Sequence, residues 1–289
     1  MRRLALAIAL FPAALVAAAA DPTEIVLWPE GVPEPRVPVD PAEKVEKGKD
    51  GIQRRTNVSN PRLVVHALPP AADGRARPAV IIAPGGGYSI LADEHEGTEI
   101  ARWCNERGIV AFTLLYRVPT GRGPGSDVGP VMDAQRAVSE VRRQAQTLGV
   151  DPTRIGLMGF SAGGHTAFVA STTRPSFPGA DTAPSSRPDC TILIYPWRLL
   201  NEDGPGLWPG VTIDKDTAPT FIAQTADDTA SPARGALALF GTLMEAKVPA
   251  ELHVYEKGGH GYGMRPRDGA PGTGDWTARL ADWLKTRGF

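Results

Sequence analysis

The chain has 289 residues, of which 42% are hydrophobic and 22% are charged, so it can bury one sizeable core. Its 31 basic and 32 acidic residues give a net charge of −1, which offers no attraction to nucleic acid or an acidic membrane. We therefore expect neither partner. No stretch has the composition of a linker, and we expect a single domain over residues 21–289.

The first twenty residues have the composition of a cleavable export signal. Arg2 and Arg3 precede an apolar run at residues 4–16, and four alanines precede Asp21. The run is short for a membrane anchor, and small residues at its end suit a signal peptidase. We therefore expect residues 1–20 to be removed, leaving a periplasmic or secreted protein without a membrane anchor. Its net charge would then be −3.

Residues 21–52 are rich in proline and charge, which predicts an extended arm lying on the domain, with residues 27–31 as its apolar anchor. Beyond the arm, short apolar runs alternate with segments of helical periodicity. Buried strands are expected at residues 62–68, 79–83, 109–116, 154–158, 191–196, 219–224 and 251–255. Amphipathic helices are expected at residues 96–107, from 130, from 166, at 231–246 and around 276–284. This alternation predicts an α/β fold, a mainly parallel central sheet with helices on both faces.

A Gly-x-Ser-x-Gly sequence at residues 159–163 follows one of these strands and precedes a helix. A serine at the apex of such a turn is held in a strained conformation that exposes its hydroxyl, and the glycines let neighbouring backbone pass closely. Ser161 is therefore the candidate nucleophile.

A serine hydroxyl needs a histidine to accept its proton and a carboxylate to orient that histidine. Asp227 or Asp228 follows one expected strand, and His260 follows the next. The carboxyl ends of parallel strands meet at one edge of the sheet, so these groups can converge on Ser161. The order serine, aspartate, histidine is that of an α/β-hydrolase.

The other four histidines have simpler interpretations. His66 and His253 fall within expected strands, and His165 lies one turn into the helix after Ser161, where packing or support of the site is expected. His95 could contact a substrate, although we expect it to be an exposed loop histidine near the site. No His-Glu-x-x-His motif or comparable cluster appears in the sequence, so we expect no metal ion and no cofactor.

A second glycine-rich segment, residues 84–88, follows the strand expected at 79–83. Three glycines at a strand end can turn their N–H groups toward a ligand, as in an oxyanion hole, although such a segment can also be an ordinary turn. Cys104 and Cys190 could pair in an oxidising compartment. Because each falls among apolar residues of an expected helix or strand, we expect both to be buried and unpaired.

Several motifs together resemble the α/β-hydrolase superfamily, and within it exported bacterial acetylxylan-esterase-like proteins, including bifunctional acetylxylan and feruloyl esterases. These motifs lie at residues 84–88, 159–165, 225–228 and 258–261, with supporting similarity at 27–31, 55–58 and 133–137. The resemblance covers nearly all of the mature chain. It implies an α/β-hydrolase fold and a secreted serine carboxylesterase acting on short acyl esters such as acetyl groups of plant xylan.

Carried over by residue, the resemblance makes Ser161 the nucleophile and His260 the general base. Prolyl-oligopeptidase-like relatives use the first aspartate of a similar turn, whereas other esterase branches place it closer to the following proline. We favour Asp227 over Asp228. The oxyanion hole would combine the Ala162 N–H with those of Gly86 and Gly87.

Two other functions remain open at this point. A small peptidase related to prolyl oligopeptidases would use the same residues, but the sequence has no repeats that could form a propeller. A non-catalytic binding module would not need the whole set of Ser161, aspartate and His260. Trp197 and Trp208, in an irregular stretch, could stack on sugar rings or only pack.

Overall fold

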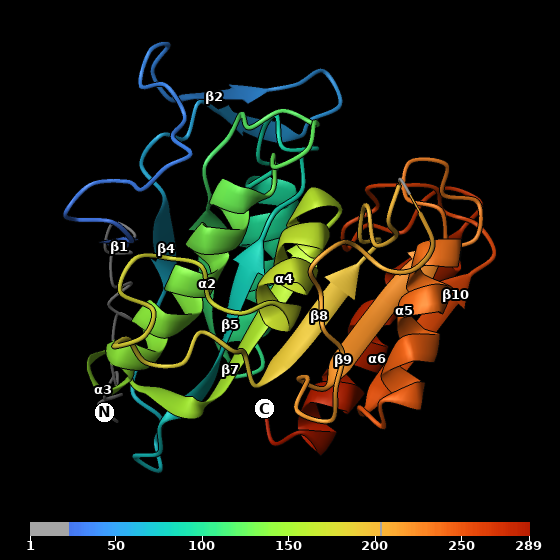
Figure 1. Cartoon of the computed structure of the whole chain (residues 1–289). Coiled ribbons are helices and arrows are strands. Elements are labelled where there is room, and N and C mark those ends of the chain that lie inside the picture. The colour runs from blue at the N-terminus through green and yellow to red at the C-terminus, as the bar shows by residue number, and fades with distance from the viewer. Residues whose placement is uncertain (1–22, 203) are drawn as a thin grey trace, which may run out of the picture.

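A computed structural model describes residues 23–202 and 204–289, so the expected export signal at residues 1–20 lies outside the described part. The described chain forms an eight-stranded sheet with helices on both sides (Figure 1). The strands of this sheet are β1 (Glu24–Val26), β4 (Arg62–His66), β5 (Arg77–Ala83), β6 (Val110–Leu115), β7 (Val150–Phe160), β8 (Cys190–Ile194), β9 (Thr220–Thr225) and β10 (Ala250–Tyr255). Every strand expected from the sequence is present, within a few residues of its expected bounds.

The sheet order is β1-β4-β6-β5-β7-β8-β9-β10. Strands β5 to β10 all run parallel to one another, while β4 pairs antiparallel with β6 and β1 pairs antiparallel with β4. The prediction of a mainly parallel sheet is therefore confirmed. Every residue of β6, β8 and β9 is buried, as expected for strands covered on both faces.

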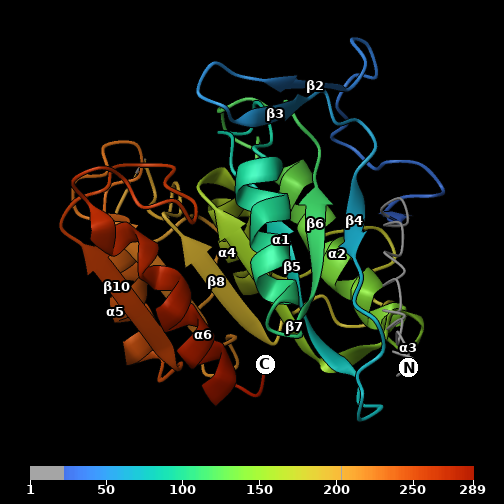
Figure 2. The same cartoon turned by 180° about the vertical axis from the view of Figure 1, so that it is seen from behind.

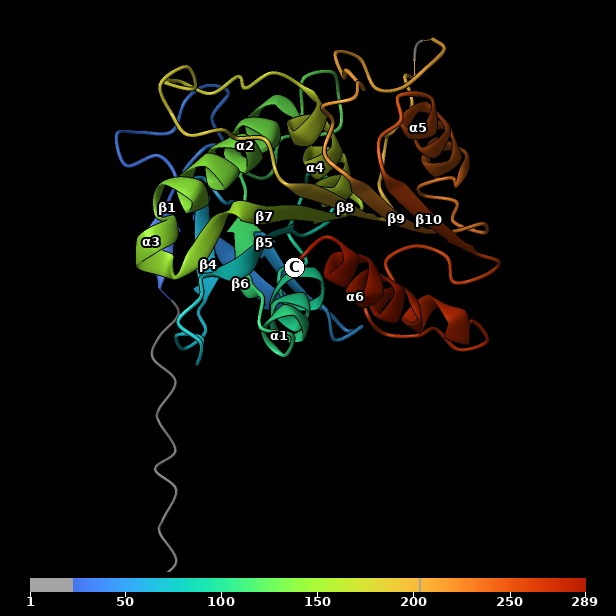
Figure 3. The same cartoon turned by 90° about the horizontal axis from the view of Figure 1, so that it is seen from below.

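The helices are α1 (Glu99–Asn105), α2 (Val128–Arg143), α3 (Ala145–Leu148), α4 (Ala162–Thr172), α5 (Arg234–Glu245) and α6 (Trp276–Thr286). Figure 3 shows α2, α4 and α5 on one face of the sheet and α1 and α6 on the other. Two separate apolar clusters fill the spaces beneath these two layers. None of the helices among the described residues is long and apolar enough to cross a bilayer.

The helix expected at residues 96–107 is shorter than expected. A π-helical turn, Glu94–Thr98, precedes α1, and Glu96 within it has non-helical backbone angles (φ −112°, ψ 17°). This irregular turn directs the Glu96 side chain into the interior, where only 4% of the residue is exposed. A short 3₁₀ helix, Pro271–Gly274, precedes α6 in the same way.

The N-terminal arm is more structured than an extended segment. Its start forms β1, and β2 (Lys44–Lys47) pairs with β3 (Gln53–Thr56) in a separate antiparallel ribbon. Figures 1 and 2 show this ribbon above the carboxyl ends of the parallel strands. Trp28 is buried, as expected for the apolar anchor, and its Nε1 donates to Asp133 Oδ1 in α2 at 2.7 Å. Through the β2–β3 ribbon, the arm reaches the carboxyl ends of the parallel strands, where the candidate site lies.

Candidate active site

Ser161 stands at the turn between β7 and α4, as the sequence predicts. Its φ of 51° and ψ of −116° are strained for a residue with a side chain. The flanking glycines are required by close backbone approach. A Cβ at Gly159 would lie 2.0 Å from the Gly163 carbonyl oxygen, and a Cβ at Gly163 would lie 2.0 Å from that of Ala83. The turn can therefore hold Ser161 in this conformation only with glycine at both positions.

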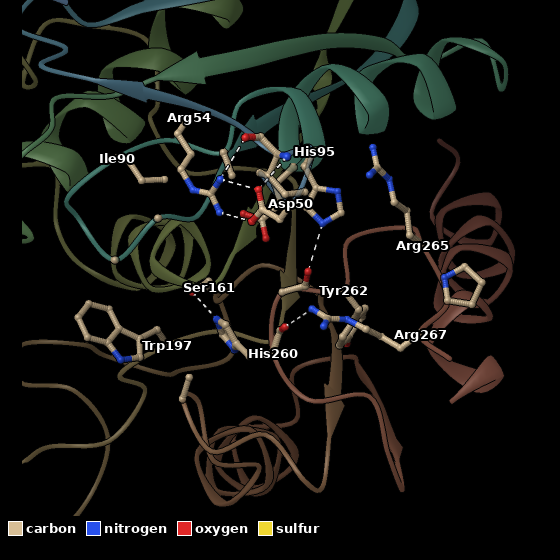
Figure 4. Close-up of a pocket in the computed structure, with 18 of the residues that line it drawn as sticks. Asp50, Arg54, Ile90, His95, Ser161, Trp197, His260, Tyr262, Arg265 and Arg267 are labelled. Carbon is tan, nitrogen blue, oxygen red and sulfur yellow. Dashed lines mark hydrogen bonds and ion pairs between the residues drawn. The ribbon is translucent and has the colours of Figure 1, made fainter. Parts of the chain in front are cut away.

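His260 lies in the loop after β10, and its Nε2 is 2.7 Å from Ser161 Oγ. Its ring packs edge-to-face with the ring of Tyr195, which follows β8, and the two ring centres are 5.1 Å apart. The Arg267 guanidinium donates to the His260 carbonyl oxygen at 2.7 Å, a contact visible in Figure 4. Two strand ends thus bring the predicted nucleophile and base into hydrogen-bond contact.

The aspartate that contacts His260 is Asp228, so the preference for Asp227 as the histidine's partner is wrong. His260 Nδ1 donates to Asp228 Oδ2 at 2.7 Å, and the Asp228 side chain is fully buried. Asp228 Oδ1 accepts the backbone N–H groups of Ala230 and Ser231 at 2.9 and 2.8 Å, which fixes the carboxylate.

Asp227 instead lies on the surface. Its carboxylate accepts the N–H groups of Gly258 and Gly259 at 3.2 and 2.8 Å. These hydrogen bonds lower the pKa of Asp227, the bond from Gly259 most of all. Asp227 therefore shapes the loop that carries His260, while Asp228 contacts its ring.

The three candidate oxyanion donors lie beside the serine. Gly86 and Gly87 line the same pocket as Ser161, and Ala162 is the first residue of α4. Gly86 and Gly87 both have positive φ, 142° and 61°, and a Cβ at Gly86 would lie 2.0 Å from the Ile90 carbonyl oxygen. The N–H of Gly85, which precedes them, is already donated to Glu96 Oε2 at 2.7 Å. This geometry leaves the next two glycines facing the pocket.

Glu96 and Tyr195 are site residues that the sequence analysis did not identify. Glu96 Oε1 accepts the Tyr195 hydroxyl at 2.7 Å, and that hydroxyl oxygen accepts the Gly263 N–H at 3.0 Å. Burial raises the pKa of Tyr195 well above its usual value, so the hydroxyl stays protonated and donates to Glu96. One buried carboxylate thereby links the glycine loop to the loop that carries His260.

The serine and histidine open into a pocket of about 780 Å³ (Figure 4). The glycine loop and Trp197 form part of its wall, and Asp50, Ile52 and Arg54 from the β2–β3 ribbon form another part. The pocket is large enough for a sugar ring and its substituent. Its lining by the ribbon could not be expected from an arm interpreted as extended.

The two tryptophans have different environments. Trp197 lines the pocket, whereas Trp208 Nε1 donates to Asp127 Oδ2 at 3.1 Å and its ring packs 4.5 Å from the His165 ring. Only Trp197 is therefore placed to contact a substrate.

Of the remaining histidines, His95 lines the pocket with Ser161 and His260, and the other three lie away from its wall. His165 is fully buried, its Nδ1 is 2.9 Å from the Tyr88 hydroxyl, and burial lowers its pKa to about 3. His95 is buried rather than exposed, contrary to expectation, and its Nε2 is 3.2 Å from the Gly261 carbonyl oxygen. It supports the loop of His260 because Gly261 is the next residue. His66 and His253 lie in β4 and β10, as expected.

Both cysteines are buried and unpaired, which confirms the expectation for Cys104 and Cys190. Burial raises the pKa of the Cys104 thiol to about 12 and that of Cys190 further, so neither is a nucleophile near neutral pH.

Comparison with known proteins finds one matching family model and relatives named for esterase and xylanase activity. The BD-FAE family model matches residues 67–186. An acetylxylan esterase from Xylanibacter ruminicola is 31% identical over 249 residues, which cover 76% of this chain and 47% of the relative. An endo-1,4-beta-xylanase B from Butyrivibrio fibrisolvens is 30% identical over 65% of this chain and 33% of its own length. The chain thus spans less than half the length of these two relatives.

Among solved structures, the acetyl ester-xyloside bifunctional hydrolase from Caldicellulosiruptor lactoaceticus superposes with a TM-score of 0.74 at 30% identity. The match covers 94% of this chain and 99% of that one. An α/β-hydrolase from a deep-sea metagenome library, MGS-M1, superposes with a TM-score of 0.66 at 25% identity over 85% and 98% of the two chains.

Proposed function

Because this chain belongs to the esterase family of α/β-hydrolases, to which BD-FAE proteins belong, we propose that it is a serine carboxylesterase that removes acetyl groups from xylan. The observation that carries the proposal is the continuous set of 2.7 Å contacts from Ser161 through His260 to Asp228 at the pocket. Relatives named for acetylxylan and acetyl xyloside chemistry support the choice of substrate.

In the first half of the proposed reaction, His260 Nε2 accepts the Ser161 hydroxyl proton as the serine oxygen attacks the ester carbonyl carbon. Asp228 holds the Nδ1–H tautomer, so Nε2 is free to act as the base, and it stabilises the imidazolium that forms. The imidazolium then gives its proton to the leaving sugar oxygen as the carbon–oxygen ester bond breaks. The acetyl group remains on Ser161.

In the second half, His260 deprotonates a water molecule that attacks the acetyl-serine carbonyl. Collapse of the second tetrahedral intermediate returns the proton to Ser161 and releases acetate. In both intermediates the carbonyl oxygen carries negative charge. The N–H groups of Ala162, Gly86 and Gly87 are proposed to bind it, and loss of one such donor typically lowers kcat by about 10²–10³.

The test is hydrolysis of p-nitrophenyl acyl esters of increasing chain length, and of acetylated xylan, by the purified protein. Ser161→Ala is the inactive variant, and Ser185→Ala, an exposed serine on a distant loop, is its matched control. We expect activity highest on acetyl esters, acetate release from xylan, loss of both in Ser161→Ala and wild-type rates in Ser185→Ala.

Each other outcome points elsewhere. Hydrolysis of aryl acetate without release from xylan would retain the esterase and discard xylan as its substrate. Equal inactivity of wild type and Ser161→Ala toward every ester would favour a peptidase or a binding module.

We also propose that the protein is exported and acts in the periplasm or outside the cell, where polymeric xylan is met. The basic and apolar composition of residues 1–20 supports this. N-terminal sequencing of the protein from periplasmic and culture fractions tests it, and a chain that stays in the cytoplasm with Met1 attached would contradict it.

A further inference from the structure

Four arginines line the pocket, and they differ in whether a carboxylate neutralises their positive charge. Arg54 pairs with Asp50 through two hydrogen bonds, of 2.9 and 2.6 Å. Arg265 pairs with Glu99. The other two, Arg122 and Arg267, have no carboxylate within 4 Å among the residues that the structure describes. Two positive charges at this pocket therefore have no carboxylate partner in the part of the chain that the structure describes.

The first of these charges lies against the glycine loop. An Arg122 guanidinium nitrogen is 3.0 Å from the position that a Cβ on Gly87 would occupy, and its central carbon is 5.9 Å from the centre of the Trp197 ring. Arg122 is exposed, so its guanidinium is open to solvent from the pocket. The free cation is thus next to Ser161's candidate oxyanion loop and beside the one tryptophan that faces the pocket.

The second charge is beside the base. One guanidinium nitrogen of Arg267 donates to the His260 carbonyl oxygen, as Figure 4 shows. Its remaining N–H groups have no carboxylate partner in the described chain. Acidic side chains do not cancel these charges within the pocket. Asp50 is held by Arg54, and the Glu96 carboxylate is buried and bonded to Gly85 and Tyr195.

From this arrangement we propose that the pocket recognises acetyl esters whose sugar part carries a carboxylate, such as a uronic acid unit, with Arg122 as the main ligand of that carboxylate. The proposal rests on the proposed esterase function and names its substrate class more narrowly. A planar guanidinium binds a carboxylate through two parallel hydrogen bonds, and such charge-assisted pairs are among the stronger polar contacts. Trp197, which lines the pocket beside Arg122, offers an aromatic contact to the sugar that carries the anion, and Arg267 adds attraction from the loop of His260.

The experiment compares two substrates that differ only at C6. In acetylated methyl glucuronoside C6 is a carboxylate, and in methyl glucoside acetylated at the same position C6 is a hydroxymethyl group. Acetate release gives kcat/KM for each, and their ratio is the readout. We expect wild type to prefer the anionic substrate by about tenfold at low salt, mainly through KM, and the preference to shrink as NaCl screens the charges.

Arg122→Gln is expected to bring the ratio close to one, and Arg122→Lys to retain part of it because the charge remains while the paired donors are lost. Arg267→Gln should reduce the ratio less. The matched control is Arg75→Gln, an exposed arginine at the opposite end of the sheet with 84% of its side chain accessible, which should keep the wild-type ratio.

The failures of the two proposals are distinguishable. A wild-type ratio of one or less, or an unchanged ratio in Arg122→Gln, would overturn the carboxylate proposal while the esterase stands. Hydrolysis of p-nitrophenyl acetate with neither sugar as substrate would also overturn it. Inactivity toward p-nitrophenyl acetate as well would refute the esterase itself.

Discussion

Asp228 and His260 are joined by a 2.7 Å hydrogen bond from Nδ1 to a carboxylate with no exposed surface, although 31 residues separate them in the chain. The adjacent Asp227 is on the other side of the same turn and binds two backbone N–H groups of the histidine loop. Two consecutive aspartates thus act on one histidine in different ways, one on its ring and one on its backbone.

This difference predicts unequal effects of the two isosteric substitutions. Asp228→Asn should lower kcat on p-nitrophenyl acetate by about 10³–10⁴, because the one amide oxygen stays with the Ala230 and Ser231 N–H groups and the NH₂ then faces Nδ1, which favours the wrong tautomer and cannot stabilise the imidazolium. Asp227→Asn should lower it by less than about tenfold, because an amide oxygen can still accept a loop N–H. Steady-state kinetics on both variants measure this, with circular dichroism to verify folding. A larger loss in Asp227→Asn than in Asp228→Asn would contradict the assignment.

Glu96 leads to a second prediction, about positioning. Glu96→Gln keeps the shape of the side chain, but its amide has one acceptor oxygen where two donors, the Gly85 N–H and the Tyr195 hydroxyl, now point. We expect the glycine loop to shift and kcat to fall about tenfold or more with little change in KM, since the loop is proposed to bind charge only in the transition state.

Tyr195→Phe serves as the matched variant for Glu96→Gln because it removes one of the two donors. It should relieve part of the defect when the two substitutions are combined. Independent, multiplicative losses in the double variant would show that the two residues do not act through one network.

His165 gives a prediction about stability and pH. Burial, together with the nearby charge of Arg198, lowers its pKa from 6.5 to about 3, so between these values the unfolded chain binds a proton that the folded chain does not. Its neutral form contributes stability above pH 6.5, and this contribution is lost as the pH falls from 6.5 toward 3, by at most about 1.4 kcal/mol per pH unit.

His165→Asn retains an acceptor for the Tyr88 hydroxyl but does not titrate in this range. Urea unfolding at pH 7 and pH 5 should therefore give a smaller loss of unfolding free energy for His165→Asn than for wild type. Parallel losses in the two proteins would mean that other groups cause the acid sensitivity.

Much of this site could be predicted from the sequence because its backbone demands are local. Gly159 is required by a contact with Gly163, within the turn itself, and the strand-to-helix turn leaves a clear pattern in the sequence, although Gly163 is required by the more distant Ala83 carbonyl oxygen on β5. The choice between Asp227 and Asp228 is not local. Both fit the same turn, and only the path of the His260 loop, 32 residues later, decides which carboxylate meets the ring.

The supporting residues were missed for a related reason. An acidic residue such as Glu96 near the start of a helix is usually a surface residue, and nothing in its neighbours reveals the π-helical turn that buries it. Tyr195 directly follows the buried strand β8 and resembles a core residue. The contribution of the β2–β3 ribbon depends on pairing of two polar segments, which apolar periodicity does not indicate.

The last prediction concerns the buried ion pair that holds the N-terminal arm. Arg117 and Asp133 have no exposed side-chain surface, and Asp133 also accepts the Trp28 indole N–H. Arg117 in turn donates to the carbonyl oxygens of Pro33 and Pro35 at 2.7 and 2.8 Å. Asp133→Asn would leave the guanidinium uncompensated in the interior, and we expect it to lower the free energy of unfolding by about 3–5 kcal/mol.

Urea unfolding measures this loss, with Asp216→Asn as a control because its ion pair with Lys215 is fully on the surface and should matter little. Limited proteolysis should cut residues 29–43 faster in Asp133→Asn than in wild type. Because the same arm continues into the ribbon that lines the pocket, KM for acetylated sugars should rise in Asp133→Asn even where the protein remains folded. A destabilised variant with unchanged KM and proteolysis would separate the ion pair from the arm.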